Sequence, residues 1–250
     1  AVHHICISHF HGDHCRGLPG VLQRLALDGC AHPVHVYYPE SGQEYLDRLC
    51  DAAIVRSRVG IVAHGVPDRP GGMVEVFRSS RIALKAMPLE HSVPTIGFRV
   101  EEPERVRFLK EKLDALGIQG PPVGKLAREG ALEVDGKIVR LEDVSVRRRG
   151  SVFAFVMDTR PCAAAVALAR GADLLVMEGT YAGAHAELAD RYLHCTAAAA
   201  AETARDAGAR RLALGHFSQR YTETDLHLRE AQAIFPDVSV LRDLDRIGIP

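Results

Sequence analysis

The stretch Ser8-His9-Phe10-His11-Gly12-Asp13-His14 decides the fold, because four strong metal-binding side chains follow directly after the apolar run Ile5-Cys6-Ile7. The apolar run predicts a buried strand. A strand points alternate side chains to opposite faces, so the four ligands must lie on the loop and helix start after it. His9 and His11 can point toward one metal position, and Asp13 and His14 can reach a second position nearby. Gly12 allows the tight turn between the pairs. This spacing favours two neighbouring divalent cations over one closed, cysteine-rich structural zinc site.

Composition sets the class of protein. A chain of 250 residues, 47% of them hydrophobic, can bury the core of a single α/β domain, 1–250. The net charge of −1 neither demands nor excludes a nucleic-acid partner. Six scattered cysteines without a C-x-x-C pair predict a reduced, cytoplasmic protein. No apolar run approaches about 18 residues, so we expect no membrane span.

Further candidate ligands follow later strands. Strands are predicted at 82–87, 151–157 and 211–215, and after them come His91, Asp158 and His216. A lone histidine is more often a packed side chain than a ligand, but the repeated position after a strand favours a metal role. These ligands converge if the strand ends share one edge of a sheet, as in two sheets covered by helices, an αββα sandwich.

The segment from about 103 to 149 differs from the rest of the chain. We expect a charged helix at 104–116, a stretch dense in Gly and Pro at 117–126, and a hairpin formed by 131–134 and 137–141. Its small apolar content predicts an arm that projects from the core. Most charged insertions are solvated excursions without a ligand. The alternative is an arm whose lysines and arginines hold a polyanion.

Two helix starts carry capping signals. Ser41 with Glu44 predicts a capping box for a helix to about Ile54. Thr196 is expected to cap the alanine-rich helix at 197–207, with its hydroxyl accepting a bond from a first-turn N–H.

Several motifs together resemble one family. Gly17-Leu18-Pro19-Gly20 follows the metal loop, and four more stretches are distinctive: His91-Ser92-Val93-Pro94, Asp158-Thr159-Arg160-Pro161, His194-Cys195-Thr196 and His216-Phe217-Ser218-Gln219-Arg220-Tyr221. The first motif alone is typical of metallo-β-lactamase-type hydrolases and names no substrate. Together the motifs resemble ribonuclease Z, the tRNA 3′-processing endonuclease family of the metallo-β-lactamase superfamily, over nearly all of the chain.

The resemblance implies a role for each candidate residue. One zinc would be bound by His9, His11 and His91, and the other by Asp13, His14 and His216, with Asp158 as the bridge. Asp13 would also accept the proton of the attacking water, because two cations lower the pKa of a shared water until hydroxide exists at neutral pH. Hydroxide would attack the phosphorus after the discriminator nucleotide, leaving a 3′-hydroxyl on the tRNA and a 5′-phosphate on the trailer.

His194, with Glu178 behind it, is a candidate to bind the phosphate or to protonate the leaving oxygen. The alternative is a helix-start histidine with structural bonds only. The resemblance also implies a homodimer, precursor tRNA as substrate, and a metallo-β-lactamase-type αββα sandwich with a protruding arm. Manganese or cobalt would fit the same ligands as zinc.

Relatives of this family carry strands before the metal motif, whereas this chain reaches it almost at once, so we expect upstream residues to be missing. Without those strands the first sheet would expose an edge. Two alternatives therefore stay open. One is a hydrolase of a small phosphodiester or ester that needs no arm, and the other is a truncated, inactive RNA-binding remnant.

Overall fold

The computed structural model describes residues 2–52 and 59–249. The chain forms two compact units, one made of residues 1–101 and 151–250 and the other of residues 102–150. None of the helices within the described residues is both long enough and apolar enough to cross a membrane.

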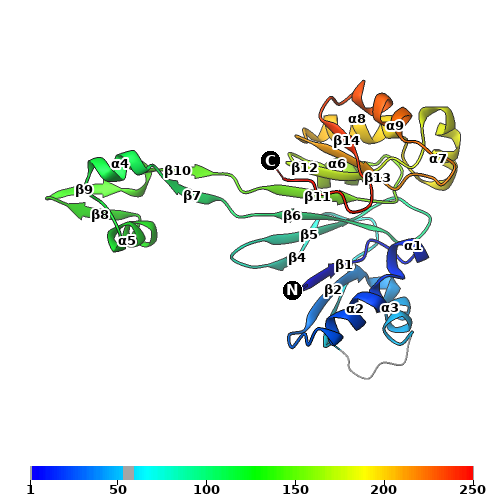
Figure 1. The fold of residues 1–250 in the computed structure, drawn as a ribbon, viewed down its shortest axis with the longest axis horizontal. Helices are drawn as coiled ribbons and strands as arrows, with labels where there is room; N and C mark the ends of the chain where they lie inside the picture. Colours follow the sequence, from blue (N-terminus) through cyan, green and yellow to red (C-terminus); the bar gives the residue numbers. More distant parts are fainter. Residues whose placement is uncertain (1, 53–58, 250) are drawn as a thin grey trace. The chain divides into compact units, whose positions relative to one another are not determined.

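The larger unit is built on two sheets (Figure 1). Three parallel strands form the small sheet: β1 (His4–Cys6), β2 (Val34–Pro39) and β3 (Ile61–Val66). The large sheet has the order β14-β13-β12-β11-β6-β5-β4. Its strands are β4 (Val74–Arg78), β5 (Ala83–Pro88), β6 (Ile96–Glu101), β11 (Val152–Val156), β12 (Leu174–Glu178), β13 (Leu212–Gly215) and β14 (Val238–Val240).

Helices cover the outer face of each sheet (Figure 1). Beside the small sheet lie α1 (Gly12–Cys15), α2 (Leu18–Leu27) and α3 (Gln43–Cys50). Beside the large sheet lie α6 (Ala163–Ala169), α8 (Ala197–Ala207) and α9 (Asp225–Gln232), whereas α7 (Ala186–Tyr192) lies past the ends of its strands.

Three apolar clusters hold the four layers together. Tyr37 and Val66 of the small sheet pack with Leu84 and Phe98 of the large sheet. The other two clusters join α2 and α3 to the small sheet and α6, α8 and α9 to the large sheet. Because apolar side chains are buried on both faces of each sheet, the arrangement is the αββα sandwich that the sequence predicted.

Residues 102–150 have a core of their own. The unit contains β7 (Arg105–Phe108), α4 (Lys110–Ala115), α5 (Pro121–Glu129), β8 (Ala131–Val134), β9 (Lys137–Arg140) and β10 (Ser145–Arg148). Leu113, Ile118, Leu126, Val139 and Val144 are buried together. Strands β7 and β10 pair antiparallel, as do β8 and β9, so the predicted hairpin is confirmed.

Two local expectations were wrong, the helix start at 104 and the cap at Ser41. Residues 105–108 form a strand rather than the start of a charged helix, because they pair with β10. The Gly/Pro-rich stretch includes the start of α5, with Pro121 in its first turn, where a missing N–H costs nothing. Ser41 lies in a 3₁₀ turn, and its hydroxyl donates to Asp68 rather than capping a helix. The predicted end of that helix near Ile54 lies outside the described residues. The Thr196 cap is confirmed, since its hydroxyl accepts a bond from the N–H of Ala199 at 3.1 Å.

His227 on α9 should make the fold sensitive to acid. Its ring is fully buried against Phe217 and Tyr221, and neither ring nitrogen has a hydrogen-bond partner among the described residues. Burial lowers the pKa of His227 below 6.5, despite the opposing charge of Glu230. Below about pH 6.5 the unfolded chain therefore binds a proton that the folded chain does not, and stability falls.

We expect His227→Leu to raise the free energy of unfolding by about 1 kcal/mol or more, because an unpaired buried polar group costs roughly 1–3 kcal/mol. We also expect the variant to lose less stability than the parent between pH 7.5 and 5.5. Urea unfolding at both pH values measures this. Equal losses in both proteins would contradict the assignment.

Candidate metal centre

The topology gathers the candidate ligands at one edge. Strands β11, β12 and β13 are parallel, and both β5 and β11 run antiparallel to β6, so β5 and β11 to β13 all end at the same edge. His91, Asp158 and His216 follow three of these strands, and Glu178 ends the fourth. The loop after β1 reaches this edge because the carbonyl of Ser8 accepts a bond from the N–H of Ile96 at 2.9 Å.

Backbone strain is concentrated here. Asp158, Leu193 and His216 have φ angles of 51°, 57° and 57°, in the left-handed region. Such a conformation costs a non-glycine residue roughly 1–2 kcal/mol and persists only where the surroundings enforce it. Two of the three are candidate ligands, and the carbonyl of Leu193 accepts a bond from Nδ1 of His91 at 3.1 Å. Each of the three residues is thus either a candidate ligand or the hydrogen-bond partner of one.

Two groups of ligand atoms meet at Asp158. The first contains His9, His11, His91 and Asp158, and its ligand atoms all lie within 4.8 Å of one another. Asp158 Oδ2 is 3.4 Å from Nε2 of His9 and 3.6 Å from Nε2 of His91. All four residues were predicted from the sequence to share a metal.

The second group contains Asp13, His14 and His216, whose ligand atoms also lie within 4.8 Å of one another. Nε2 of His14 is 3.3 Å from Asp13 Oδ2 and 3.4 Å from Asp158 Oδ2. Nε2 of His216 is 3.3 Å from the other Asp158 oxygen, Oδ1. Asp158, 2% exposed, thus contacts members of both groups.

The charges of the site are strongly coupled. Burial lowers the pKa of His9 to about 3, so this imidazole is neutral. Burial would raise the pKa of Asp158, but the hydrogen bond from His14 and the neighbouring histidines outweigh it and hold this pKa well below its ordinary value. Burial would likewise lower the pKa of His14, but Asp158 raises it. The neutral ring of His9 and the ionised carboxylate of Asp158 are in the protonation states that metal binding needs, and His14 would release its proton on binding a metal.

Unpaired atoms indicate that the site is built for cations. Nε2 of His9 and Oδ1 of Asp158 are buried without a hydrogen-bond partner among the described residues. Nε2 of His14 lies 3.1 Å from Nε2 of His216. Two such nitrogens share one proton at best, and buried polar atoms are rarely left unpaired. Divalent cations would satisfy all of these lone pairs, so the donor set fits them.

Comparison with known proteins decides the family. A sequence profile described as the metallo-beta-lactamase superfamily matches residues 1–103. The ribonuclease Z of Nocardia farcinica (strain IFM 10152) is 49% identical over 247 residues, covering 98% of this chain and 80% of the relative. That of Thermobifida fusca (strain YX) is also 49% identical, covering 98% of this chain and 78% of the relative. The chain belongs to the ribonuclease Z family. It spans about four fifths of these relatives' length.

Solved structures agree on the fold. The short form of human tRNase Z has a TM-score of 0.65 at 24% identity, covering 99% of this chain and 79% of that one. The metallo-beta-lactamase fold protein YhfI from Bacillus subtilis has a TM-score of 0.62 at 17% identity, covering 96% and 75%. The fold and the clusters of histidine and aspartate together support a divalent metal in this member of the ribonuclease Z family.

His194, the remaining residue that the ribonuclease Z resemblance singled out, lies at the same edge. Its Nδ1 is 3.1 Å from both carboxylate oxygens of Glu178. Burial lowers the pKa of His194, but the hydrogen bond and charge of Glu178 outweigh it and raise this pKa. One ligand atom of His194 also lies within 4.8 Å of those of Asp158 and His216, so the ring borders the metal groups.

Apart from Glu178, which the sequence analysis placed behind His194, the residues that orient these ligands were not predicted. The hydroxyl of Thr180 is 2.9 Å from Nδ1 of His216 and donates to Glu178 at 2.6 Å. Glu178, which is fully buried, also accepts bonds from the backbone N–H groups of Thr159 and Cys195. Ser8 Oγ lies 3.1 Å from Nδ1 of His9. Hydroxyl and carbonyl partners are too common in any sequence to be recognised before the fold places them.

Proposed function

We propose that the chain is a metal-dependent endoribonuclease that removes 3′ trailers from tRNA precursors. The observation that carries the proposal is the 49% identity to ribonuclease Z relatives along 98% of the chain. The convergence of all seven predicted ligand positions at one edge supports it. The small-substrate hydrolase and the inactive remnant are less favoured, because neither requires both this similarity and a full ligand set.

Two zinc ions are the cofactors we propose. His9, His11 and His91 would hold one, Asp13, His14 and His216 the other, and Asp158 both. Two ligand groups that meet at a single carboxylate support this number. Manganese or cobalt would suit the same nitrogen and oxygen donors. Cations held here would acidify water and offset negative charge on a phosphate.

The side chains around the metals have separate tasks. Asp13 would accept the proton of the attacking water; its carboxylate is 70% exposed and can reach solvent. Partial burial would raise the pKa of Asp13, but a backbone N–H and the neighbouring His14 and His216 outweigh it and lower this pKa, so the group is ionised at neutral pH. Water adds to phosphorus, the bond to O3′ breaks, and that oxygen takes a proton from His194. The products are a tRNA 3′-hydroxyl and a trailer 5′-phosphate.

His194→Ala should lower kcat by about 10²- to 10⁴-fold, the usual contribution of a positioned acid. Because Glu178 raises the pKa of His194, the acid stays protonated to higher pH, and activity should fall as pH rises through that pKa. Glu178→Gln should therefore move the alkaline limb of the kcat profile to lower pH. An unmoved limb, with metal content intact, would contradict this role. His185→Ala is a matched histidine control, since His185 contacts Tyr221 rather than Glu178.

The unit at 102–150 is the proposed substrate arm. Eleven Lys and Arg residues against nine Asp and Glu make it only slightly basic, so the arrangement of charge matters more than its sum. On the β7–β10 ribbon, Arg105 lies opposite Arg148 and Arg107 opposite Val146. Since alternate residues share a face, Arg105, Arg107 and Arg148 line one side. Like charges directly opposite destabilise a ribbon, and a phosphate backbone would offset that cost.

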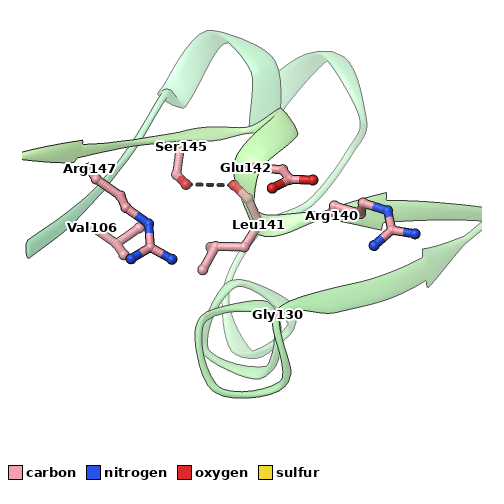
Figure 2. A pocket seen from close by; sticks show the side chains of 7 residues that line it. All are labelled: Val106, Gly130, Arg140, Leu141, Glu142, Ser145 and Arg147. Carbon is pink, nitrogen blue, oxygen red and sulfur yellow. Dashed lines mark hydrogen bonds between the residues drawn. The ribbon is translucent and has the colours of Figure 1, made fainter.

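A pocket in the same unit carries further arginines, on the other face of the ribbon, where Val106 and Arg147 lie. It has a volume of about 350 Å³ and is lined by side chains that include Arg140, Glu142 and Arg147. Figure 2 shows Arg140 and Arg147 on opposite sides of Leu141, whose carbonyl accepts the hydroxyl of Ser145. Exposed arginines separated in this way suit contacts with successive phosphates better than one small anion.

Precursor tRNA is therefore the partner that we propose. A homodimer and a cytoplasmic location remain predictions from the resemblance and the cysteine pattern. Sedimentation of the purified chain at micromolar concentration would test the dimer.

Cleavage of a precursor tRNA with a 3′ trailer tests the function. Cutting should occur after the discriminator nucleotide, leave a 3′-hydroxyl and a 5′-phosphate, and stop when a chelator is added. Cutting that continues in the chelator, or end groups of the opposite kind, would contradict the proposal.

A further inference from the structure

A small apolar pocket adjoins the metal centre. Its volume is about 240 Å³, and His11 forms part of its wall. The other walls include Phe10, Pro39, Tyr45 and Pro94. Pockets that hold whole cofactors are usually larger, roughly 300–1,000 Å³. This pocket therefore suits a single planar ring system that reaches it from the metal site.

The aromatic wall is fixed in place. The ring of Phe10 lies against the backbone of Gly42, where a Cβ atom would come within 2.1 Å of it. Phe10 also contacts Tyr38 at 6.2 Å and Tyr45 at 5.6 Å between ring centroids. Tyr45 is 51% exposed, so part of its ring surface is open to solvent next to the fixed ring of Phe10. An exposed aromatic next to a rigid one is a ready stacking platform.

The pocket offers few polar groups to a ligand, because those of Ser41 are already hydrogen-bonded. The hydroxyl and backbone N–H of Ser41 both donate to Asp68 Oδ2. Pro39, Val93 and Pro94 line other parts of the pocket with apolar side chains. Such a wall can stack on any base but cannot read its edge, so the site would tolerate every base identity.

We propose that this pocket holds one unpaired nucleobase flanking the scissile phosphate. The inference rests on the proposed function. His11 belongs to both the first ligand group and the pocket wall, so a phosphate bound at the metals has its neighbouring base within reach of Tyr45. The base is either that of the last tRNA nucleotide or that of the first trailer nucleotide.

The test compares Tyr45→Ala, Tyr45→Phe and Arg48→Ala in the full chain. Arg48 lies on the same helix and covers the Tyr45 ring at 5.9 Å, but it lines no part of the pocket. Each variant is assayed on three precursor tRNAs: unmodified, abasic at the last tRNA nucleotide, and abasic at the first trailer nucleotide. Metal content and unfolding midpoints are measured alongside.

On the unmodified substrate, Tyr45→Ala should lose about 5- to 150-fold in kcat/KM, the range for one stacked base. Tyr45→Phe should restore the rate, and Arg48→Ala should retain it within about twofold. On one abasic substrate, parent and Tyr45→Ala should be equal, and that substrate identifies the base. A loss that persists on both abasic substrates, or no loss at all, overturns the inference. A parent that cuts none of the three overturns the proposed function itself.

Discussion

Asp158→Asn is expected to lower kcat/KM for precursor tRNA by at least about 10³-fold. The carboxylate of Asp158 lies close to ligand atoms of both groups, and an amide carries no negative charge to hold two cations. The metal contribution is worth several kcal/mol, and each 1.36 kcal/mol is tenfold in rate. Asparagine tolerates the left-handed backbone at φ 51°, so the loss should not come from strain. Single-turnover cleavage together with metal analysis measures the effect.

Asp173→Asn is the matched control for this variant. Asp173 is also buried, and it accepts a bond from the N–H of Val152 at the opposite end of β11. Its substitution should reduce stability without removing a metal ligand. If Asp158→Asn retained both metals and a parental rate, Asp158 would not be the bridge.

Removing residues 103–149 should separate substrate recognition from chemistry. Gly150 lies so close to the carbonyl of Glu102 that an added Cβ would come within 2.1 Å of it, so a two-glycine linker can join the ends. We expect cleavage of precursor tRNA to fall by about 100-fold or more, equivalent to two charged hydrogen bonds at roughly 1.5 kcal/mol each. Turnover of a small aryl phosphodiester should be retained within a few-fold.

A less drastic variant checks the deletion. Changing Arg105, Arg107 and Arg148 together to alanine should weaken tRNA binding and flatten its salt dependence, by about one unit of slope per phosphate contact. If the deletion left tRNA cleavage unchanged, the arm would be a solvated excursion and the small-substrate hydrolase would regain support. If both substrates were lost, the larger unit would require the insertion for its own folding.

The convergence of the candidate ligands could be predicted because these residues carry distinctive chemistry at positions set by strand ends. His91, Asp158 and His216 each follow a strand, and these strands all end at one edge because β11 and β13 are parallel to β12 while β5 and β11 are both antiparallel to β6. What orients them was not predictable, since it depends on a carbonyl at Leu193 and a hydroxyl at Thr180 that only the fold brings near. Ser41 failed as a cap for a similar reason, because a distant carboxylate, Asp68, takes its hydroxyl.

The insertion was harder to predict than the core. Its local sequence favours a helix near Arg105, but pairing between β7 and β10 makes it a strand, which is a tertiary effect on propensity. Its buried leucines and valines are widely spaced in the sequence, so its small apolar content predicts a projecting arm but not the small core that includes Leu113 and Leu126. No element was predicted for the Gly/Pro-rich stretch, in which α5 begins at Pro121.

The central claim is that seven converging side chains hold two cations that together cut precursor tRNA. The most direct measurement titrates metal-free chain with zinc while following cleavage of a precursor tRNA with a 3′ trailer. We expect activity to rise until two equivalents per chain are bound, with cutting after the discriminator nucleotide throughout. Full activity at one equivalent, or a folded chain that binds two zinc ions and leaves the trailer attached, would contradict the account.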